Sequence, residues 1–203
     1  MIKNQQEIIE DYKWEISRKE FIRSLFVLGA VSQIPFLTSC ESEDKLRDFE
    51  CSPLSKNQLK VLQAFQLVLF PKEGFGPSAL EVNADKWIVY VLNDDREPQR
   101  EKDFIIENLD GLNVFSKEQH DTTFDLLSSI QKEDLVELFF EDKTQKRWGS
   151  RILTLIFEAL LLDPIYGVNP ENIGWEWLNH NPGMPRPNSE NKYPEIYSTI
   201  NEV

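Results

Sequence analysis

Between residues 55 and 92 the apolar residues recur at the three- and four-residue spacing of a helix. Ser55 stands at an N-cap position, and Pro71 ends the first predicted helix because proline lacks the backbone donor that would continue it. That helix carries its apolar stripe on Leu59, Leu62, Phe65 and Leu69. A loop with glycine and proline, residues 72–82, leads to a second helix that begins near Asn83. The second stripe consists of Trp87, Ile88, Val91 and Leu92.

The middle of the chain predicts a series of shorter helices. The polar stretch 94–98 ends in proline and breaks the second helix. An amphipathic piece around Ile105 follows, with Gly111 placed to cap its end. Ser116 and Gln119 have the spacing of a capping box, which would open another helix. The apolar positions of these helices are Phe104, Ile105, Leu109, Phe124, Leu127, Ile130, Leu135, Leu138 and Phe139.

The longest apolar segment lies between residues 148 and 162 and is apolar on nearly all sides. One stripe consists of Trp148, Ile152, Leu155, Ile156 and Ala159, and the remainder is largely covered by Leu153, Phe157, Leu160 and Leu161. A helix of this kind is typical of the centre of a helical bundle. Strand-like alternation is absent from the sequence, so we predict an all-α fold. A chain of 203 residues can bury one sizeable core, and residues 55–203 are expected to form a single helical domain.

The segment DPIYGVNPENIGWEWLNHNPGMPRP, residues 163–187, predicts a long irregular region near the C-terminus. It holds five of the eleven prolines and three of the eight glycines, which interrupt regular structure. Tyr166, Trp175 and Trp177 are candidates for docking a partner, because such side chains concentrate binding energy at interfaces. The alternative is that these rings cover the open end of the core. Both interpretations hold if one tryptophan points inward and the other outward.

The first 39 residues have the features of an export signal. An apolar run at residues 24–37 follows basic residues and is too short to span a bilayer. It ends in LTSC, which is similar to the lipobox of bacterial lipoproteins. We therefore predict a signal peptide at residues 1–39, lipid attachment at Cys40 and a polar tether over residues 40–54. The alternative is a buried N-terminal helix. A doubly or triply acylated cysteine is a stable membrane anchor, whereas Cys51 is either free or bonded to another chain.

A second export feature overlaps the first. Residues 17–22, SRKEFI, resemble the twin-arginine motif through Arg18, Lys19 and Phe21, with lysine in place of the second arginine. Signals of that type carry folded proteins across the membrane. The alternative is an ordinary signal for an unfolded chain. Both routes lead to a lipid-anchored location in the bacterial cell envelope, facing the periplasm or exposed at the surface.

The charge balance of the chain is acidic. It has 35 aspartates and glutamates against 22 lysines and arginines, for a net charge of −13. A surface of this sign repels phosphates, so we do not expect the chain to bind nucleic acid.

The sequence shows no catalytic constellation, and we expect no catalytic, cofactor-binding or metal-binding residue in this chain. The two histidines, His120 and His180, have no cysteine or histidine near them, although metal and haem sites need converging ligands. The GFGP stretch at residues 74–77 lacks the spacing of a dinucleotide-binding loop. Glu158 stands inside the apolar segment, where Arg151 or solvent would satisfy it. The alternative is a buried carboxylate with a functional role.

Two blocks of the chain carry a family resemblance. The first is a helix end before a glycine-containing loop: Leu69, Phe70 and Pro71, followed by Gly74 and Gly76. The second consists of Glu158, Asp163, Pro164, Tyr166, Gly167, Asn169, Gly174 and Trp175. With these residues the sequence resembles the gluconate 2-dehydrogenase subunit 3 family from about residue 55 to 178, but not in the tail that follows. Val168 stands where members of that family usually have a second glycine.

The resemblance implies a small accessory subunit of a membrane-associated flavoprotein dehydrogenase. The implied partner is a large subunit, similar to glucose-methanol-choline oxidoreductases, that holds FAD and oxidises a sugar, a sugar acid or a polyol. Some such complexes add a cytochrome c subunit. The small subunit would bind no cofactor itself and would supply the export signal. The alternative is a stand-alone envelope lipoprotein that binds carbohydrate or another protein.

Overall fold

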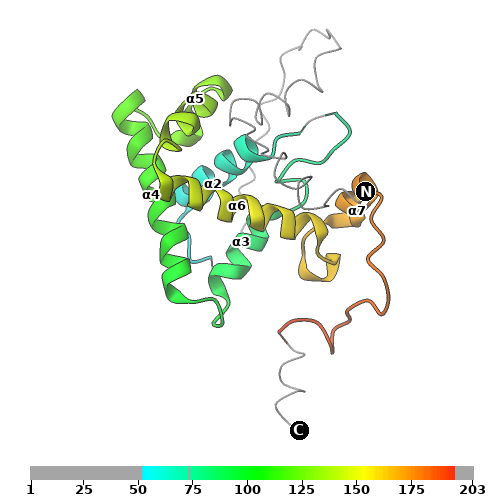
Figure 1. The fold of residues 1–203 in the computed structure, drawn as a ribbon. Helices are drawn as coiled ribbons and strands as arrows, with labels where there is room; N and C mark the ends of the chain where they lie inside the picture. The colour runs from blue at the N-terminus through cyan, green and yellow to red at the C-terminus, as the bar shows by residue number, and fades with distance from the viewer. Residues whose placement is uncertain (1–51, 73, 195–203) are drawn as a thin grey trace, which may run out of the picture. The chain divides into compact units, whose positions relative to one another are not determined.

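The computed structural model describes residues 52–72 and 74–194, and every regular element among them is helical (Figure 1). The α-helices are α2 (Lys56–Leu69), α3 (Ala84–Asn93), α4 (Gln99–His120), α5 (Ser129–Phe139), α6 (Lys143–Leu161) and α7 (Ile173–Leu178). Three short 3-10 helices lie between them: η2 (Phe124–Leu126), η3 (Pro164–Tyr166) and η4 (Pro170–Asn172). The predicted all-α fold is confirmed for this part of the chain.

The predicted features of the N-terminal region lie outside the described residues. They are the signal peptide at residues 1–39, its export residues Arg18, Lys19 and Phe21, the lipid attachment site Cys40, the cysteine Cys51 and most of the tether at 40–54.

The predicted starts of α2 and α3 are confirmed. Ser55 caps α2: its hydroxyl accepts a hydrogen bond from the backbone N–H of Gln58, and the Gln58 side chain accepts one from the backbone of Ser55. These two bonds form a capping box that satisfies donors otherwise left free at a helix start. Asn83 is the N-cap residue of α3, in the left-handed region at φ 59°.

The prediction for residues 104–130 was wrong in its helix boundaries. Instead of ending at Gly111 and restarting at Ser116, α4 runs without a break to His120. Its buried residues are Ile105, Asn108, Leu109, Leu112 and Ser116, a single stripe at helical spacing that passes over Gly111. The Ser116 hydroxyl donates to the carbonyl of Thr122 at 2.9 Å instead of capping a new helix. A capping box does form in this region, but between Ser128 and Gln131 at the start of α5.

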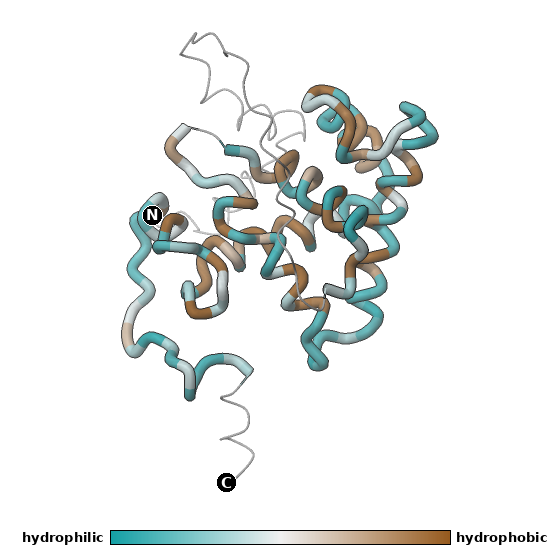
Figure 2. The backbone as a smooth tube through the Cα atoms, turned by 180° about the vertical axis from the view of Figure 1, so that it is seen from behind, coloured by the Kyte–Doolittle hydropathy of each residue, from teal (hydrophilic) through white to brown (hydrophobic). Residues whose placement is uncertain are grey.

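Helices α2 and α6 hold the core together. Helix α2 contacts α3, α4, α5, α6 and η2, and α6 contacts α2, α3, α4 and α7. The rings of Phe65 on α2 and Trp148 on α6 stack at a centroid distance of 4.4 Å. The predicted α6 stripe is fully buried, but Phe157 and Leu161 are 44% and 45% exposed, so α6 is not buried on all sides. Apolar and polar residues alternate along the helices of the described chain, as expected when each helix buries one face (Figure 2).

Residues 163–187 are more regular than their composition predicts. They begin with η3 and η4 and continue with the short helix α7, which contacts α6. The connecting turns use left-handed backbone at Asn169, Glu171, Asn172 and Asn179, where φ lies between 46° and 62°. Asparagine adopts this region more readily than other non-glycine residues. From residue 179 to 194 the described chain contains no helix.

One buried residue of α2 predicts a stabilising substitution. Gln66 is 0% exposed, and neither its Nε2 nor its Oε1 has a hydrogen-bond partner among the described residues. Burying an unpaired amide costs about 1–3 kcal/mol, so Gln66→Leu should raise the free energy of unfolding by a similar amount. Urea denaturation followed by circular dichroism measures this change.

A matched control lies one turn earlier on the same helix. Gln63 donates to the carboxylate of the buried Asp85 at 2.9 Å. Gln63→Leu removes that donor and should therefore lower the stability. If both leucine variants changed the stability in the same direction, the presence or absence of a hydrogen bond to each glutamine side chain would not account for the effect.

Candidate functional site

Asn169 organises the turn that follows α6, and its side chain is fully buried. Its Nδ2 donates to the carbonyl of Leu162 at 3.2 Å, and its Oδ1 accepts from the N–H of Gly174 at 2.7 Å. Its own backbone N–H donates to the carbonyl of Val82 at 3.0 Å. One residue thus joins the end of α6 to the start of α7 and ties both to the loop before α3.

Gly174 allows α7 to approach the backbone of α6. A Cβ atom at this position would lie 2.3 Å from the carbonyl oxygen of Leu160 and 3.1 Å from Oδ1 of Asn169. The first distance is far below any van der Waals contact. Any larger residue would therefore push α7 away from α6 and weaken the hydrogen bond between the Gly174 N–H and Asn169.

The other motif residues of this block also shape the backbone. Asp163 caps η3 by accepting from the N–H of Ile165 at 3.0 Å, and Pro164 occupies the first position of that 3-10 helix. Gly167 ends it in the left-handed region at φ 79°, and the Gly167 carbonyl accepts from the Asn83 side chain at 3.0 Å. The block thus folds the chain back from α6 onto the start of α3.

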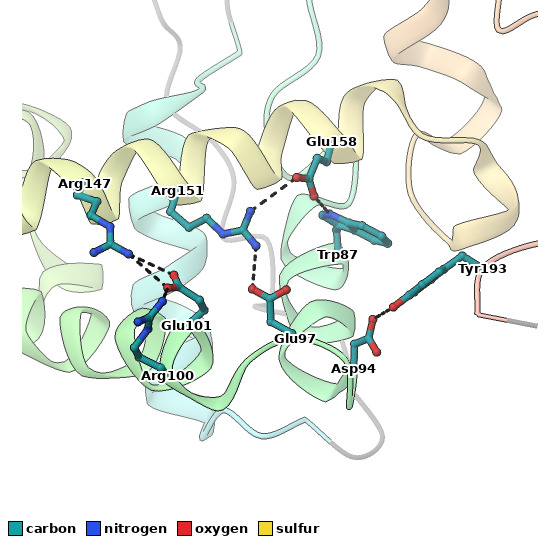
Figure 3. Close-up of polar contacts among 9 residues, drawn as sticks. All are labelled: Trp87, Asp94, Glu97, Arg100, Glu101, Arg147, Arg151, Glu158 and Tyr193. Carbon is teal, nitrogen blue, oxygen red and sulfur yellow. Dashed lines mark hydrogen bonds and ion pairs between the residues drawn. The ribbon is translucent and has the colours of Figure 1, made fainter. Parts of the chain in front are cut away.

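Glu158 takes part in a row of polar contacts, the polar seam, formed by Trp87, Glu97, Arg151 and Glu158 (Figure 3). The Glu158 carboxylate accepts from the indole N–H of Trp87 at 2.7 Å and lies 3.8 Å from Arg151. Arg151 donates to Glu97 at 3.1 Å. The seam ties α6 to α3 and to the turn between α3 and α4. The expectation that Arg151 or solvent satisfies Glu158 is confirmed, since Arg151 pairs with it and its side chain is 37% exposed, but the shorter contact with Trp87 was not predicted.

Residues 179–194, the C-terminal strap, are attached to the helices at two points. Arg186 forms an ion pair with Asp163 at 2.8 Å, and its guanidinium lies 4.8 Å from the centre of the Trp175 ring. At the other end, Tyr193 donates its hydroxyl to Asp94 and its backbone N–H to the hydroxyl of Tyr166, the latter at 3.1 Å. The strap thus runs from α7 back to the end of α3.

The contact between Tyr193 and Asp94 changes the acidity of both groups. Burial alone would raise the pKa of Asp94, but hydrogen bonds from the Tyr193 hydroxyl and from the backbone N–H of Arg96 outweigh it and lower that pKa. The hydrogen bond to Asp94 raises the pKa of Tyr193, and burial adds to this effect. Each group therefore favours the protonation state in which Tyr193 donates and Asp94 accepts.

The three predicted docking residues lie in different surroundings. Trp175 is only 5% exposed, and its indole N–H donates to the carbonyl of Leu161 at 2.7 Å. Tyr166 is half-buried, with its ring edge-on to Trp87. Trp177 is 44% exposed. Of these residues, Trp177 therefore presents the most accessible ring, while Trp175 belongs to the packing between α6, α7 and the strap.

Sequence reasoning missed an exposed aromatic residue. Phe75 is 105% exposed, in the loop between α2 and α3. It stands between Gly74 and Gly76, and Pro77 follows Gly76. A phenylalanine flanked by two glycines in a turn is the signal that points to it, but only the glycines and the proline of this loop were used in the prediction.

Both histidines are exposed on the described surface, His120 at the end of α4 and His180 after α7. The predicted capping box at Ser116 and Gln119 would place His120 in the first turn of a helix, which is wrong, because α4 ends there. Within the described residues, no group of three or more histidine, cysteine, aspartate or glutamate side chains could hold a metal ion. None of the helices described is both long enough and apolar enough to cross a membrane.

Comparison with known families gives one match. The model of the family described as gluconate 2-dehydrogenase subunit 3 matches residues 56–183. The chain belongs to the gluconate 2-dehydrogenase subunit 3 family. Searches of curated proteins and of solved structures found no match.

The gluconate 2-dehydrogenase subunit 3 match covers more than half of the 203 residues. It begins at the first residue of α2 and ends after α7, so it spans all the α-helices of the described chain. It also reaches Gly183, farther into the tail than the sequence resemblance suggested, but not Arg186 or Tyr193 of the strap. This family is the small subunit of gluconate 2-dehydrogenase complexes. In this chain its motif residues build the turn between α6 and α7.

Proposed function

We propose that this chain is a non-catalytic accessory subunit and export partner of an FAD-dependent dehydrogenase in the cell envelope. Membership of the gluconate 2-dehydrogenase subunit 3 family, over the whole set of described helices, is the observation that carries this proposal. The partner is a glucose-methanol-choline type subunit that holds the FAD and oxidises a sugar, a sugar acid or a polyol, with a cytochrome c subunit as electron acceptor in complexes that contain one.

The contacts of the motif residues support an accessory role. Asn169 uses both ends of its amide for backbone hydrogen bonds, and Asp163 caps η3 and pairs with Arg186. Glu158 is engaged by Trp87 and Arg151. These polar groups maintain a shape, and a catalytic acid, base or nucleophile would instead have to present itself to a substrate.

The N-terminal sequence supports the export role. A flavoprotein folds around its FAD, so its export needs a route that accepts folded proteins. The SRKEFI stretch, with Arg18, Lys19 and Phe21, resembles the signal for such a route. The small subunit would carry the folded partner across the membrane and then hold it there through lipid on Cys40.

The proposal is tested by extracting the full chain, tagged at its C-terminus, from membranes of its native host with a mild detergent. We expect a second chain of flavoprotein size in stoichiometric amount, with flavin absorbance, and a lipid mass on the small subunit. Because the lipid supplies the anchor, Cys40→Ser should move both chains from the membrane fraction to the soluble fraction. Intact mass spectrometry and the flavin absorbance of each fraction measure this.

Cys51→Ser is the matched control, since it removes the other cysteine of the chain and should leave the fractionation unchanged. A colourless wild-type chain that elutes alone would contradict the subunit assignment. A wild-type complex whose flavoprotein stays in the membrane after Cys40→Ser would contradict only the anchoring role.

A further inference from the structure

Phe70 contacts the rings of Phe157 and Trp177, and Phe75 lies beside them in the loop whose Gly76 rests on the Trp177 ring. These four aromatic residues from separate segments are here called the aromatic patch. Phe70 follows the end of α2, Phe75 lies in the next loop, Phe157 is on α6 and Trp177 is on α7. The fold therefore brings together rings that are about a hundred positions apart in the sequence.

Phe70 is the centre of the aromatic patch. Its ring is edge-on to Phe157 at a centroid distance of 6.0 Å and to Trp177 at 6.1 Å. Both arrangements are favourable for aromatic pairs. Phe70 itself is packed against the core and only partly exposed, so it lies between the core and the rings of Phe157 and Trp177.

Gly76 joins the Phe75 loop to the same surface. A Cβ atom at Gly76 would lie 2.8 Å from the Trp177 ring, so the backbone of the loop rests directly on that ring. Phe75, the neighbouring residue, projects fully into solvent at 105% exposure. Leu161, one helical turn beyond Phe157 and 45% exposed, extends the patch along α6.

The exposed area is large for a small chain. An aromatic residue removes about 150–250 Å² from water when it is fully buried, so Phe75, Phe157 and Trp177 together expose on the order of 400 Å² of residue surface. Apolar patches of about 300–600 Å² on a monomer are often functional. A stable interface buries about 800 Å² on each partner, so the patch would supply roughly half of one side.

The charge around the patch indicates what would cover it. At the base of the loop the ammonium group of Lys72 is paired with the carboxylate of Glu81, which offsets its charge. On α7, Glu176 is exposed next to Trp177, and the chain as a whole carries a net charge of −13. A complementary surface is therefore apolar at its centre and basic at its rim.

We propose that the aromatic patch is the face by which this chain docks on the FAD-binding dehydrogenase subunit, with Phe75 entering an apolar hollow whose rim carries lysine or arginine. This inference rests on the proposed function and names the residues that make the contact. Aromatic residues that become fully buried in a pocket of the partner are typical binding hot spots.

Two other occupants fit the surface less well. Anionic lipid headgroups would be repelled by the acidic chain. A symmetric contact with a second copy would need a hollow for Phe75 on the same face. Two hollows on the described surface, one between α2 and α4 and one beside Trp175 and His180, are lined by other residues.

The test uses the flavoprotein subunit that co-purifies with the wild-type chain, identified by its mass and its flavin absorbance. Its Kd for the full chain is measured by biolayer interferometry after separation and re-association. Phe75→Ala should weaken binding about 30-fold or more, the loss typical of a hot-spot residue. Because Phe75 is fully exposed, the Phe75→Ala variant should have the same thermal unfolding temperature as the wild type. Rising salt should slow association if the partner rim is basic.

Two equally apolar surface positions away from the patch serve as controls. Leu126 on η2 and Ile130 on α5 are both 72% exposed, and Leu126→Ala and Ile130→Ala should leave the Kd within twofold of the wild type. If these variants weakened binding as much as Phe75→Ala does, the patch would have no special role.

The remaining outcomes separate this inference from the proposed function. Equal affinity of wild type and Phe75→Ala for the flavoprotein overturns the patch and leaves the subunit role intact. Equal affinity together with loss of Phe75→Ala from the membrane fraction assigns the patch to lipid. A wild-type dimer that Phe75→Ala dissociates assigns it to self-association. A wild-type chain without a flavoprotein overturns both proposals.

Discussion

Replacing Trp175 by alanine should lower the free energy of unfolding by about 3–5 kcal/mol, the loss expected when a buried tryptophan leaves a cavity. The Trp175 ring is 5% exposed and lies under the guanidinium of Arg186. Its indole N–H is bonded to the carbonyl of Leu161 at 2.7 Å, so the substitution also leaves that carbonyl without its donor. Urea denaturation followed by circular dichroism measures the change.

Trp177→Ala is the matched comparison, two positions further along α7. The Trp177 ring is 44% exposed and contacts Phe70 and the Gly76 loop, so its loss should cost only about 1–2 kcal/mol. Its larger effect should fall on binding of the flavoprotein. If Trp175→Ala kept full stability and lost its partner, Trp175 would be a docking residue and its assignment to the packing would be wrong.

The contrast between these two tryptophans could not be read from the sequence. Side chains two positions apart on a helix point in nearly opposite directions, because each residue turns the chain by about 100°. The two directions can be deduced only if residues 173–178 are known to be helical, and the nearby Pro170 and Gly174 predicted an irregular segment instead. Gly174 is needed because α7 lies against the backbone of α6. This is a tertiary contact, and the neighbouring sequence contains no pattern that indicates it.

The helices α2, α3 and α6 were predictable because local signals and packing agree. In α2 the capping residue Ser55 precedes a stripe that the fold buries, and Pro71 follows the end of the helix. In α6 the predicted stripe from Trp148 to Ala159 is completely buried. Where propensity, capping and periodicity point to one answer, a single sequence is enough.

The continuation of helix α4 past Gly111 was missed because its local signals conflict with its packing. Gly111 costs a helix interior about 1 kcal/mol, whereas burying a leucine on either side stabilises the chain by about 1.5–3 kcal/mol. Leu109 and Leu112 are both buried, so the continuous helix is preferred. The capping-box pattern at Ser116 and Gln119 was a chance match, since Ser116 is buried inside the helix.

The aromatic patch was only partly predictable for a related reason. Composition placed aromatic residues in the C-terminal segment, and Trp177 among them is exposed. The patch, however, also needs Phe70, Phe75 and Phe157 from three other segments. Their proximity follows from the packing of α6 and α7 against the end of α2, which no spacing in the sequence encodes.

Gly174→Ala should lower the free energy of unfolding by about 2–4 kcal/mol, because the new methyl group would lie 2.3 Å from the carbonyl oxygen of Leu160. Relief requires α7 to move outward, which stretches the 2.7 Å bond from Gly174 to Asn169. Gly111→Ala is the opposite case: its Cβ atom would meet nothing within 4 Å in the middle of α4. That variant should raise stability by about 0.5–1 kcal/mol, since alanine is the better helix former. Urea denaturation of the two variants measures both changes. Effects of the same sign would show that backbone freedom, and not the approach of α7 to α6, accounts for the glycine at position 174.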